Sequence, residues 1–258
     1  MSRTLVLLYG AACYLVFLAT FLYAIGFVAG FGVPKHIDNG IAGAVPLALL
    51  VDAALLALFA MQHSVMARPG FKRWWVRFVP PAVERSTYVL CASLALIALF
   101  AWWRPIHGDA WDVQAPALRW LLLGLSACGW LLVLAGTFLI SHFELFGLRQ
   151  VWLHARGRVA TESPFVTRAF YRVVRHPLML GFLVAFWATP RMSWGHLLFA
   201  LMTTGYIVLA VKYLEERDLV AAHGEAYLRY QREVPMLLPL TRRRRAPAAP
   251  RGIAGRAR

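Results

Sequence analysis

Long apolar segments constrain this chain more than any other feature of its sequence. Four of them, 4–31, 44–65, 86–103 and 118–140, are long enough to cross a bilayer as helices, which takes about 20 residues. A fifth apolar region, 178–213, has room for two passes and is interrupted at Thr189–Arg191, where a Pro followed by a charge is typical of a hairpin tip. The first arm of this hairpin is short, so the hairpin need not cross the whole bilayer. The pattern predicts an all-α polytopic membrane protein with five or six membrane segments.

The composition agrees with a membrane protein. Hydrophobic residues make up 60% of the chain and charged residues 15%, whereas soluble domains have about 45–50% and roughly 25%. Segment 4–31 is too long for the apolar part of a cleavable signal peptide and is expected to be the first span. The cysteines are widely spaced within apolar runs, which fits neither a disulfide framework nor a zinc site: Cys13, Cys91 and Cys128.

The net charge of +15 would suggest nucleic-acid binding in a soluble chain. Here the connections 34–43 and 104–116 carry few basic residues, and Arg and Lys gather in the alternate ones: 67–85, 141–176 and the residues from 212 onward. This alternation follows the positive-inside rule and places both termini in the cytoplasm, most simply of a bacterial inner membrane. We therefore expect a lipid bilayer, and no nucleic acid, as the partner of this charge. The pattern leaves the oligomeric state open.

A polar cluster with the sequence YRVVRHPLMLG occupies Tyr171–Gly181. Pro177 favours a helix start, because the first helical residue needs no N–H. Arg175 and His176 directly precede it, and a helix N-terminus with free amides attracts a carboxylate or phosphate. Gly181, one turn further, would let a ligand approach the backbone. The alternative is a basic topology signal followed by an ordinary helix start.

Three acids, Glu215, Glu216 and Asp218, directly follow the predicted hairpin, where basic residues are usual. Glu216 lies one turn from Lys212, so the two side chains could form a local ion pair. Alternatively, the acids accept hydrogen bonds from ribose hydroxyls or hold Arg175 and His176. Residues 223–230 are expected to form a short amphipathic helix with two tyrosines, Tyr227 and Tyr230, on one face.

Together the motifs RHP-x-x-x-G, EER, G-x-x-Y-x-x-Y and V-P-x-x-x-P resemble the C-terminal cofactor site of isoprenylcysteine carboxyl methyltransferases and phospholipid methyltransferases. The resemblance covers residues 171–239. It implies S-adenosylmethionine bound between the hairpin and the C-terminal helix. Met179 stands where that superfamily often has Tyr. The cofactor-binding residues implied are Arg175, His176, Pro177, Met179, Gly181, Glu215, Glu216 and Tyr227.

Unbroken blocks elsewhere resemble a smaller family, the bacterial membrane-bound methanethiol S-methyltransferases. These blocks include FAMQHSVMARP at 59–69, ERSTYV at 84–89, HFELFGLRQ at 142–150 and AFWATP at 185–190. The resemblance implies methylation of methanethiol to dimethyl sulfide at the cytoplasmic face. Two alternatives stay open: an NADPH-dependent membrane reductase of the sterol-reductase type, and a non-enzymatic membrane protein of the NnrU-like kind.

Methylation of a thiol is helped by a base or an electropositive pocket, because alkyl thiols are mostly protonated at neutral pH. Ionisable groups near the cytoplasmic ends of the predicted spans are costly there and are usually functional. The catalytic candidates are His63, Tyr88, His142 and Glu144.

Each candidate also has a purely structural interpretation. His63 could hydrogen-bond between helices, Glu144 could pair with Arg149, and Glu84 with Arg85. Asp52 lies three helical turns from His63, about 16 Å, so it is expected to meet a different partner. Three histidines fall on the opposite side of the membrane and are excluded from the site: His36, His107 and His196.

These predictions divide the chain into three parts. Residues 1–141 form the N-terminal membrane helices, residues 142–240 form the methyltransferase-like cofactor region, and residues 241–258 form a basic tail. The tail has no apolar pattern and is expected to be disordered on anionic headgroups.

Overall fold

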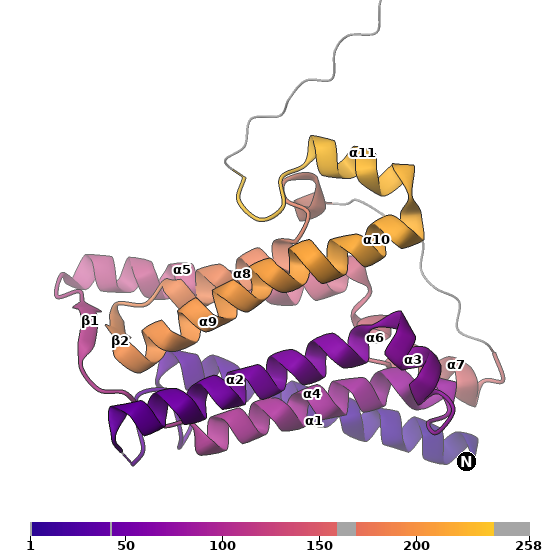
Figure 1. Ribbon diagram of the computed structural model, residues 1–258, viewed down its shortest axis with the longest axis horizontal. Helices are drawn as coiled ribbons and strands as arrows, with labels where there is room; N and C mark the ends of the chain where they lie inside the picture. The colour runs from indigo at the N-terminus through magenta and orange to yellow at the C-terminus, as the bar shows by residue number, and fades with distance from the viewer. Residues whose placement is uncertain (1, 42, 159–168, 240–258) are drawn as a thin grey trace, which may run out of the picture.

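A computed structural model describes residues 2–41, 43–158 and 169–239 as an elongated bundle of helices (Figure 1). The predicted tail at 241–258 lies outside the described residues. Five helices are long and apolar enough to cross a membrane, with α9 counted together with its continuation to His223. They are α1 (Arg3–Ala29), α2 (Val45–Ala67), α4 (Pro81–Trp102), α5 (Pro116–Ile140) and α9 (Trp194–Ala210). The shorter apolar helix α8 (Pro177–Trp187) completes the hairpin. The predicted all-α polytopic fold is confirmed.

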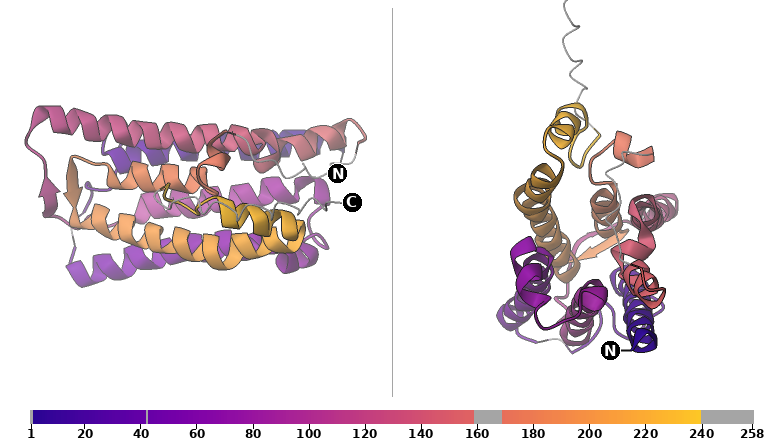
Figure 2. Two further views of the ribbon diagram at one scale, coloured as in Figure 1. Left: turned by 90° about the horizontal axis from the view of Figure 1, so that it is seen from above. Right: turned by 90° about the vertical axis from the view of Figure 1, so that its right-hand side faces the viewer.

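Proline begins several of these helices, as its missing N–H allows. It occupies the first turn of α2, α4, α5 and α8, and the last of these begins at Pro177 as predicted. The helices form two layers, with α1, α2 and α4 in one and α5, α8 and α9 in the other (Figure 2). Aromatic side chains from both layers meet in the core: Phe27, Phe100, Trp130, Phe186 and Phe199.

Short elements cap the two ends of the bundle differently. Strands β1 (Asp109–Asp112) and β2 (Arg191–Ser193) pair antiparallel at one end. The remaining elements lie away from the strand pair, to the right of centre or above the bundle in Figure 1. These are α3 (Pro69–Trp75), α6 (His142–Leu145), α7 (Leu148–Ala155), the 3₁₀ turn η1 (Ala169–Arg172), the π-helical turn η2 (Val211–Glu215), α10 (Glu216–His223) and α11 (Glu225–Glu233).

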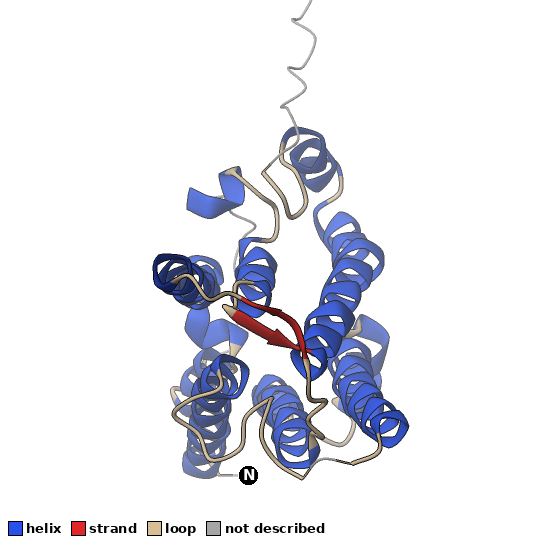
Figure 3. Ribbon diagram, turned by 90° about the vertical axis from the view of Figure 1, so that its left-hand side faces the viewer, coloured by secondary structure: helices blue, strands red, loops and turns tan. Residues whose placement is uncertain are grey.

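The strand pair fixes how far the hairpin reaches. Strand β1 belongs to the connection between α4 and α5, and β2 to the tip between α8 and α9, where the break at Thr189–Arg191 was predicted. Their pairing brings the hairpin tip to the same end of the bundle as the α4–α5 connection (Figure 3). The extended residues after Trp187 therefore add to the reach of the short helix α8.

Helix α8 packs along α5 with the two backbones in close approach. A Cβ atom on Gly181 would lie 2.8 Å from both the carbonyl oxygen of Gly129 and the amide nitrogen of Val133. A Cβ on Gly129 would likewise lie 2.6 Å from the amide nitrogen of Ala185. Small residues permit such contacts between membrane helices. Gly181 was expected to admit a ligand to the backbone; instead it admits helix α5.

Candidate functional site

The RHP and EER motifs meet at the junction of η2 and α10. The Nε of Arg175 donates to Oε1 of Glu216 at 2.6 Å, and Nε2 of His176 lies 3.3 Å from the same oxygen. Nδ1 of His176 lies 3.5 Å from Oε1 of Glu215. The prediction that the acids hold Arg175 and His176 is confirmed. The predicted ion pair between Lys212 and Glu216 is wrong: none is present among the described residues, and the ammonium of Lys212 lies over the Tyr213 ring instead.

A π-helical turn lets both neighbouring acids reach one histidine. Residues Val211–Glu215 form this turn between α9 and α10, and it ends where the two glutamates begin. Such turns insert an extra residue into a helix and are frequent at functional sites. This turn was not predicted from the sequence, because the residues VKYLE carry no local signal that separates a π-helical turn from an α-helical one.

His176 is buried, and its two neighbouring glutamates stabilise its protonated form. Burial lowers the pKa of His176, but the hydrogen bonds and negative charges of Glu215 and Glu216 outweigh this and raise it to about 9. The imidazole is therefore an imidazolium at neutral pH. The Glu215 side chain is 44% exposed and that of Glu216 only 10%. Glu215 is thus the acid that a ligand can reach.

The chain after α11 closes over the start of α8. The backbone N–H of Arg175 donates to the carbonyl of Pro235 at 2.9 Å, and that of His176 to Met236 at 3.1 Å. The Arg175 guanidinium also donates to the carbonyls of Gln231 and Val234. With its donors used in this way, Arg175 holds the C-terminal segment in place rather than facing outward.

Three tyrosines surround this cluster. Tyr227 and Tyr230 lie on one buried face of α11, as predicted, with their rings 5.7 Å apart. The hydroxyl of Tyr230 donates to the carbonyl of Tyr171 at 2.5 Å. Burial and the charge of Glu215 raise the pKa of the Tyr171 hydroxyl. Sequence reasoning did not single out Tyr171 as a site residue. Met179 packs with Ile207, Val211 and Leu237.

A second group joins His63 and Tyr88, which lie on α2 and α4. The Tyr88 hydroxyl is 3.0 Å from Nδ1 and 3.1 Å from Nε2 of His63. Next to His63, the hydroxyl of Ser64 lies 3.0 Å from that of Tyr206 on α9. One turn on, Arg68 pairs with Asp218 of α10 at 3.0 Å. Helix α2 therefore runs beside the same α9–α10 segment that carries the two glutamates.

Arg85 lies one turn before Tyr88 on α4. Its Cζ atom is 5.1 Å from the centre of the Tyr88 ring, and its Nε donates to the carbonyl of Leu145 at 2.8 Å. Within the described residues no ion pair joins Arg85 to Glu84, so that predicted link is wrong.

His142 has a hydrogen bond at each ring nitrogen. Thr137 donates its hydroxyl proton to the carbonyl of Leu134, so its oxygen accepts from Nδ1 of His142 at 2.8 Å. Nε2 then accepts from the hydroxyl of Tyr14 at 2.9 Å. Burial lowers the pKa of His142, in keeping with this neutral tautomer. His142 therefore ties α1 to the end of α5.

Glu144 pairs with Arg149 at 2.7 Å, which confirms the structural interpretation of that acid. Phe146, two residues on, packs in the same apolar cluster as Tyr88, Met66 and Phe17. Segment 142–146 thus contacts the His63–Tyr88 group through the Phe146 ring, while His142 bonds to Tyr14 and Thr137 and Glu144 bonds to Arg149.

Several polar residues belong to the opposite end of the bundle, as predicted. His196 is buried beside the carbonyl of Phe186, at 2.9 Å. Residues 106 and 108, which flank His107, bond to the start of α9, and His36 lies in the loop after α1. Asp52 accepts the backbone N–H of Arg104 at 2.9 Å, so its partner differs from His63, as expected.

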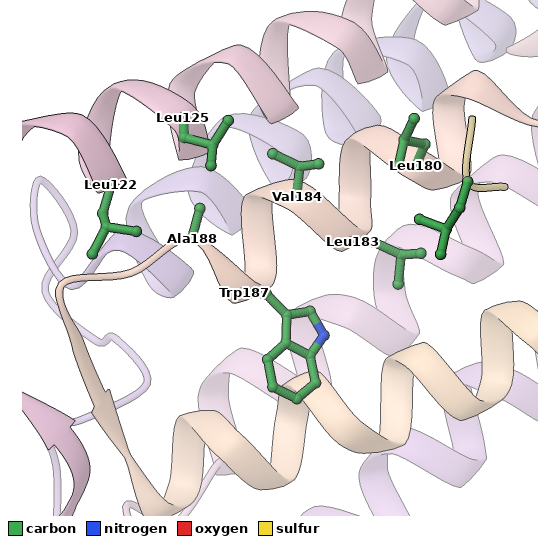
Figure 4. Close-up of a pocket in the computed structure, with 8 residues that line it drawn as sticks. Leu122, Leu125, Leu180, Leu183, Val184, Trp187 and Ala188 are labelled. Carbon is green, nitrogen blue, oxygen red and sulfur yellow. The ribbon is translucent and has the colours of Figure 1, made fainter. Parts of the chain in front are cut away.

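An apolar groove of about 370 Å³ runs along α5 and α8. Figure 4 shows side chains of both helices lining it. The indole N–H of Trp187, in this lining, donates to Thr204 of α9 at 2.9 Å. The groove therefore offers no polar group for chemistry and suits apolar material such as lipid chains. Its lining is Leu122, Leu125, Leu180, Leu183, Val184, Trp187, Ala188 and Leu238.

Known proteins similar to this chain share most of its length. A protein of Mycobacterium tuberculosis named methanethiol S-methyltransferase is 58% identical over 239 residues, 93% of this chain and 98% of that protein. One of the same name from Pseudomonas is 54% identical over 90% of this chain and 89% of its own. Nurim from Sus scrofa is 37% identical over 68% of each chain. No family model and no solved structure matches. The chain belongs to the methanethiol S-methyltransferase family.

Proposed function

We propose that this protein transfers the methyl group of S-adenosylmethionine to methanethiol and so makes dimethyl sulfide. The observation that carries the proposal is 51–58% identity, over more than nine-tenths of the chain, to proteins named methanethiol S-methyltransferase. Those names favour methyl transfer over NADPH-dependent reduction and over a non-enzymatic membrane role. We further propose that the site opens to the cytoplasm from a bacterial inner membrane, since the basic connections lie at its end of the bundle.

The cluster around His176 fits the polar groups of S-adenosylmethionine. We assign the exposed carboxylate of Glu215 to the ribose hydroxyls, and the His176 imidazolium, whose two ring nitrogens face Glu215 and Glu216, to holding that carboxylate in place. Arg175 and Glu216 are bonded to each other and position these two side chains. Tyr227, Pro177 and Met179 shape the surrounding wall. When bound, the cofactor supplies a methyl group activated by its sulfonium charge.

The thiol is assigned to the His63–Tyr88 group. His63 is the proton acceptor for the thiol, and the Tyr88 hydroxyl orients its ring. The side chains of Met66, Phe17 and Phe146 give this region the apolar surface that suits a methylthiol. His142 and Glu144, through Tyr14 and Arg149, brace the segment that carries Phe146.

Headspace detection of dimethyl sulfide from cells that express the chain and are fed methanethiol tests the proposal. We expect wild type to make dimethyl sulfide and His176→Ala to lose at least about 100-fold of the rate. The exposed residue Arg77 provides a control variant, Arg77→Gln, which should keep the wild-type rate. A full rate for His176→Ala would show that the cofactor assignment is wrong.

Calorimetry with the purified protein in detergent tests the cofactor independently of turnover. S-adenosylhomocysteine should bind, and NADPH should not. Binding of NADPH without S-adenosylhomocysteine would replace the methyltransferase proposal with the reductase alternative.

A further inference from the structure

We propose that Arg85 supplies the positive charge that stabilises the substrate thiolate beside His63 and Tyr88. This proposal rests on the proposed function and adds a residue that the sequence motifs did not single out for chemistry. It begins from the placement of Arg85, half-buried on α4 one turn before Tyr88. Its guanidinium stacks over the Tyr88 ring, whose hydroxyl contacts both ring nitrogens of His63.

The guanidinium of Arg85 is hydrogen-bonded through Nε, and its two terminal NH₂ groups are available to a ligand. Its Nε donates to the carbonyl of Leu145 at 2.8 Å, which fixes the plane of the group. In the described part of the chain, the two terminal NH₂ groups reach no protein acceptor. A planar guanidinium presents these donors in a fixed fork that suits an anion.

Three other arginines close to the two candidate groups pair with acids. Arg68 pairs with Asp218, Arg175 with Glu216 and Arg149 with Glu144. Across the described residues Arg85 has no such carboxylate within 4.0 Å. A half-buried charge without a counter-ion is costly, which favours an anionic ligand at this point.

The other groups that act on the His63–Tyr88 pair leave Arg85 as the dominant positive charge. They are Arg68 just after α2, Glu84 from α4, Tyr206 from α9 and Glu215 from η2. Of these, Arg68 forms an ion pair with Asp218. The Tyr206 hydroxyl is hydrogen-bonded to that of Ser64, and the Glu215 carboxylate lies 3.5 Å from Nδ1 of His176.

The chemistry requires such a charge, because the thiolate is the nucleophile and an alkyl thiol is mostly protonated at neutral pH. The S–H proton passes to the His63 imidazole, and the electron pair stays on sulfur beside Arg85. The thiolate sulfur then forms a bond to the methyl carbon of the sulfonium donor. The donor's own methyl–sulfur bond breaks, and its electron pair stays on the departing thioether. His63 returns the proton to water.

The test compares two nucleophiles across pH with the full chain in nanodiscs. Methanethiol needs help to ionise, whereas methaneselenol is already ionised at neutral pH. For Arg85→Gln we expect about a 100-fold loss of kcat/KM with methanethiol at pH 7. The loss should shrink as the pH rises and should be less than about 3-fold with methaneselenol. Arg85→Lys, which keeps the charge, should recover part of the rate, and Arg77→Gln should match wild type.

The outcomes separate this proposal from the function on which it rests. An equal loss for both nucleophiles at every pH would mean that Arg85 is only structural, and an unchanged Arg85→Gln would mean that its charge is not used. Binding of S-adenosylhomocysteine by Arg85→Gln reports that the variant is folded. A folded wild type that methylates neither nucleophile overturns the proposed function and this proposal with it.

Discussion

Two arginines near the candidate site differ in role because their guanidinium groups have different hydrogen-bond partners. Arg175, whose side chain is 10% exposed, donates to Glu216 and to two backbone carbonyls, so it fastens the C-terminal segment to the start of α8. Arg85 is half-buried and bonds to the protein through Nε. The residue type is the same, but the first acts within the fold and the second faces a ligand in our proposal.

The charge of His176 makes the stability of the protein depend on pH. Its pKa is raised from 6.5 to about 9, so the protonated form contributes stability that is complete below about pH 6.5 and is lost as pH rises through 9. The shift corresponds to a contribution on the order of 3 kcal/mol. We expect the Tm of wild type to fall between pH 7 and 10, and that of His176→Asn to be lower at pH 7 and flatter. Thermal unfolding in detergent across this range measures both, and parallel profiles would contradict the assignment.

At the scale of elements, the contact between α5 and α8 positions the RHP motif. Leu178, in the first turn of α8, lies against Gly136 of α5, where a Cβ atom on the glycine would be 3.2 Å away. Two further glycines, Gly129 and Gly181, bring the backbones together along the same contact. The small residues thereby set the position of α8 along α5, and the hydrogen bonds at its N-terminus then fix His176.

Gly181→Ala should separate these helices. The added Cβ would meet backbone atoms at 2.8 Å, and overpacking of this kind costs roughly 1–3 kcal/mol. Gly205→Ala on α9 is the matched control, because nothing lies within 4 Å of its added Cβ; it should stabilise the helix by up to about 1 kcal/mol. Thermal unfolding of the two variants should therefore shift in opposite directions, with S-adenosylhomocysteine affinity reduced in Gly181→Ala alone. Equal Tm shifts of the same sign would mean that close packing at Gly181 does not hold α8 against α5.

At the scale of the whole molecule, the two ends of the bundle differ in charge and in structure. One end carries the paired strands and few basic residues, and the other carries the basic connections with both candidate groups. The proposed orientation places the strand end outside the cytoplasm.

Cysteine labelling of intact cells checks this orientation. Gln114 and Arg77 are exposed near opposite ends, and Cys128 is the exposed native thiol, to be replaced by Ala beforehand. A membrane-impermeant maleimide should label Gln114→Cys and leave Arg77→Cys unlabelled until the membrane is opened. The reverse pattern would invert the orientation and move the site away from the cytoplasm.

The sequence by itself determined the spans, the hairpin and the basic ends, because bilayer thickness and the hydropathy of each segment act locally on the chain. Its motifs also predicted the family, which the similar proteins confirm. The division at residues 141 and 142 stays a prediction. Only the tertiary structure decided which polar groups meet. Glu216 bonds to Arg175, 41 residues away, rather than to Lys212 one turn before it, and His142 bonds to Tyr14 across 128 residues. Such pairs depend on helix packing and on the π-helical turn, which no local pattern encodes.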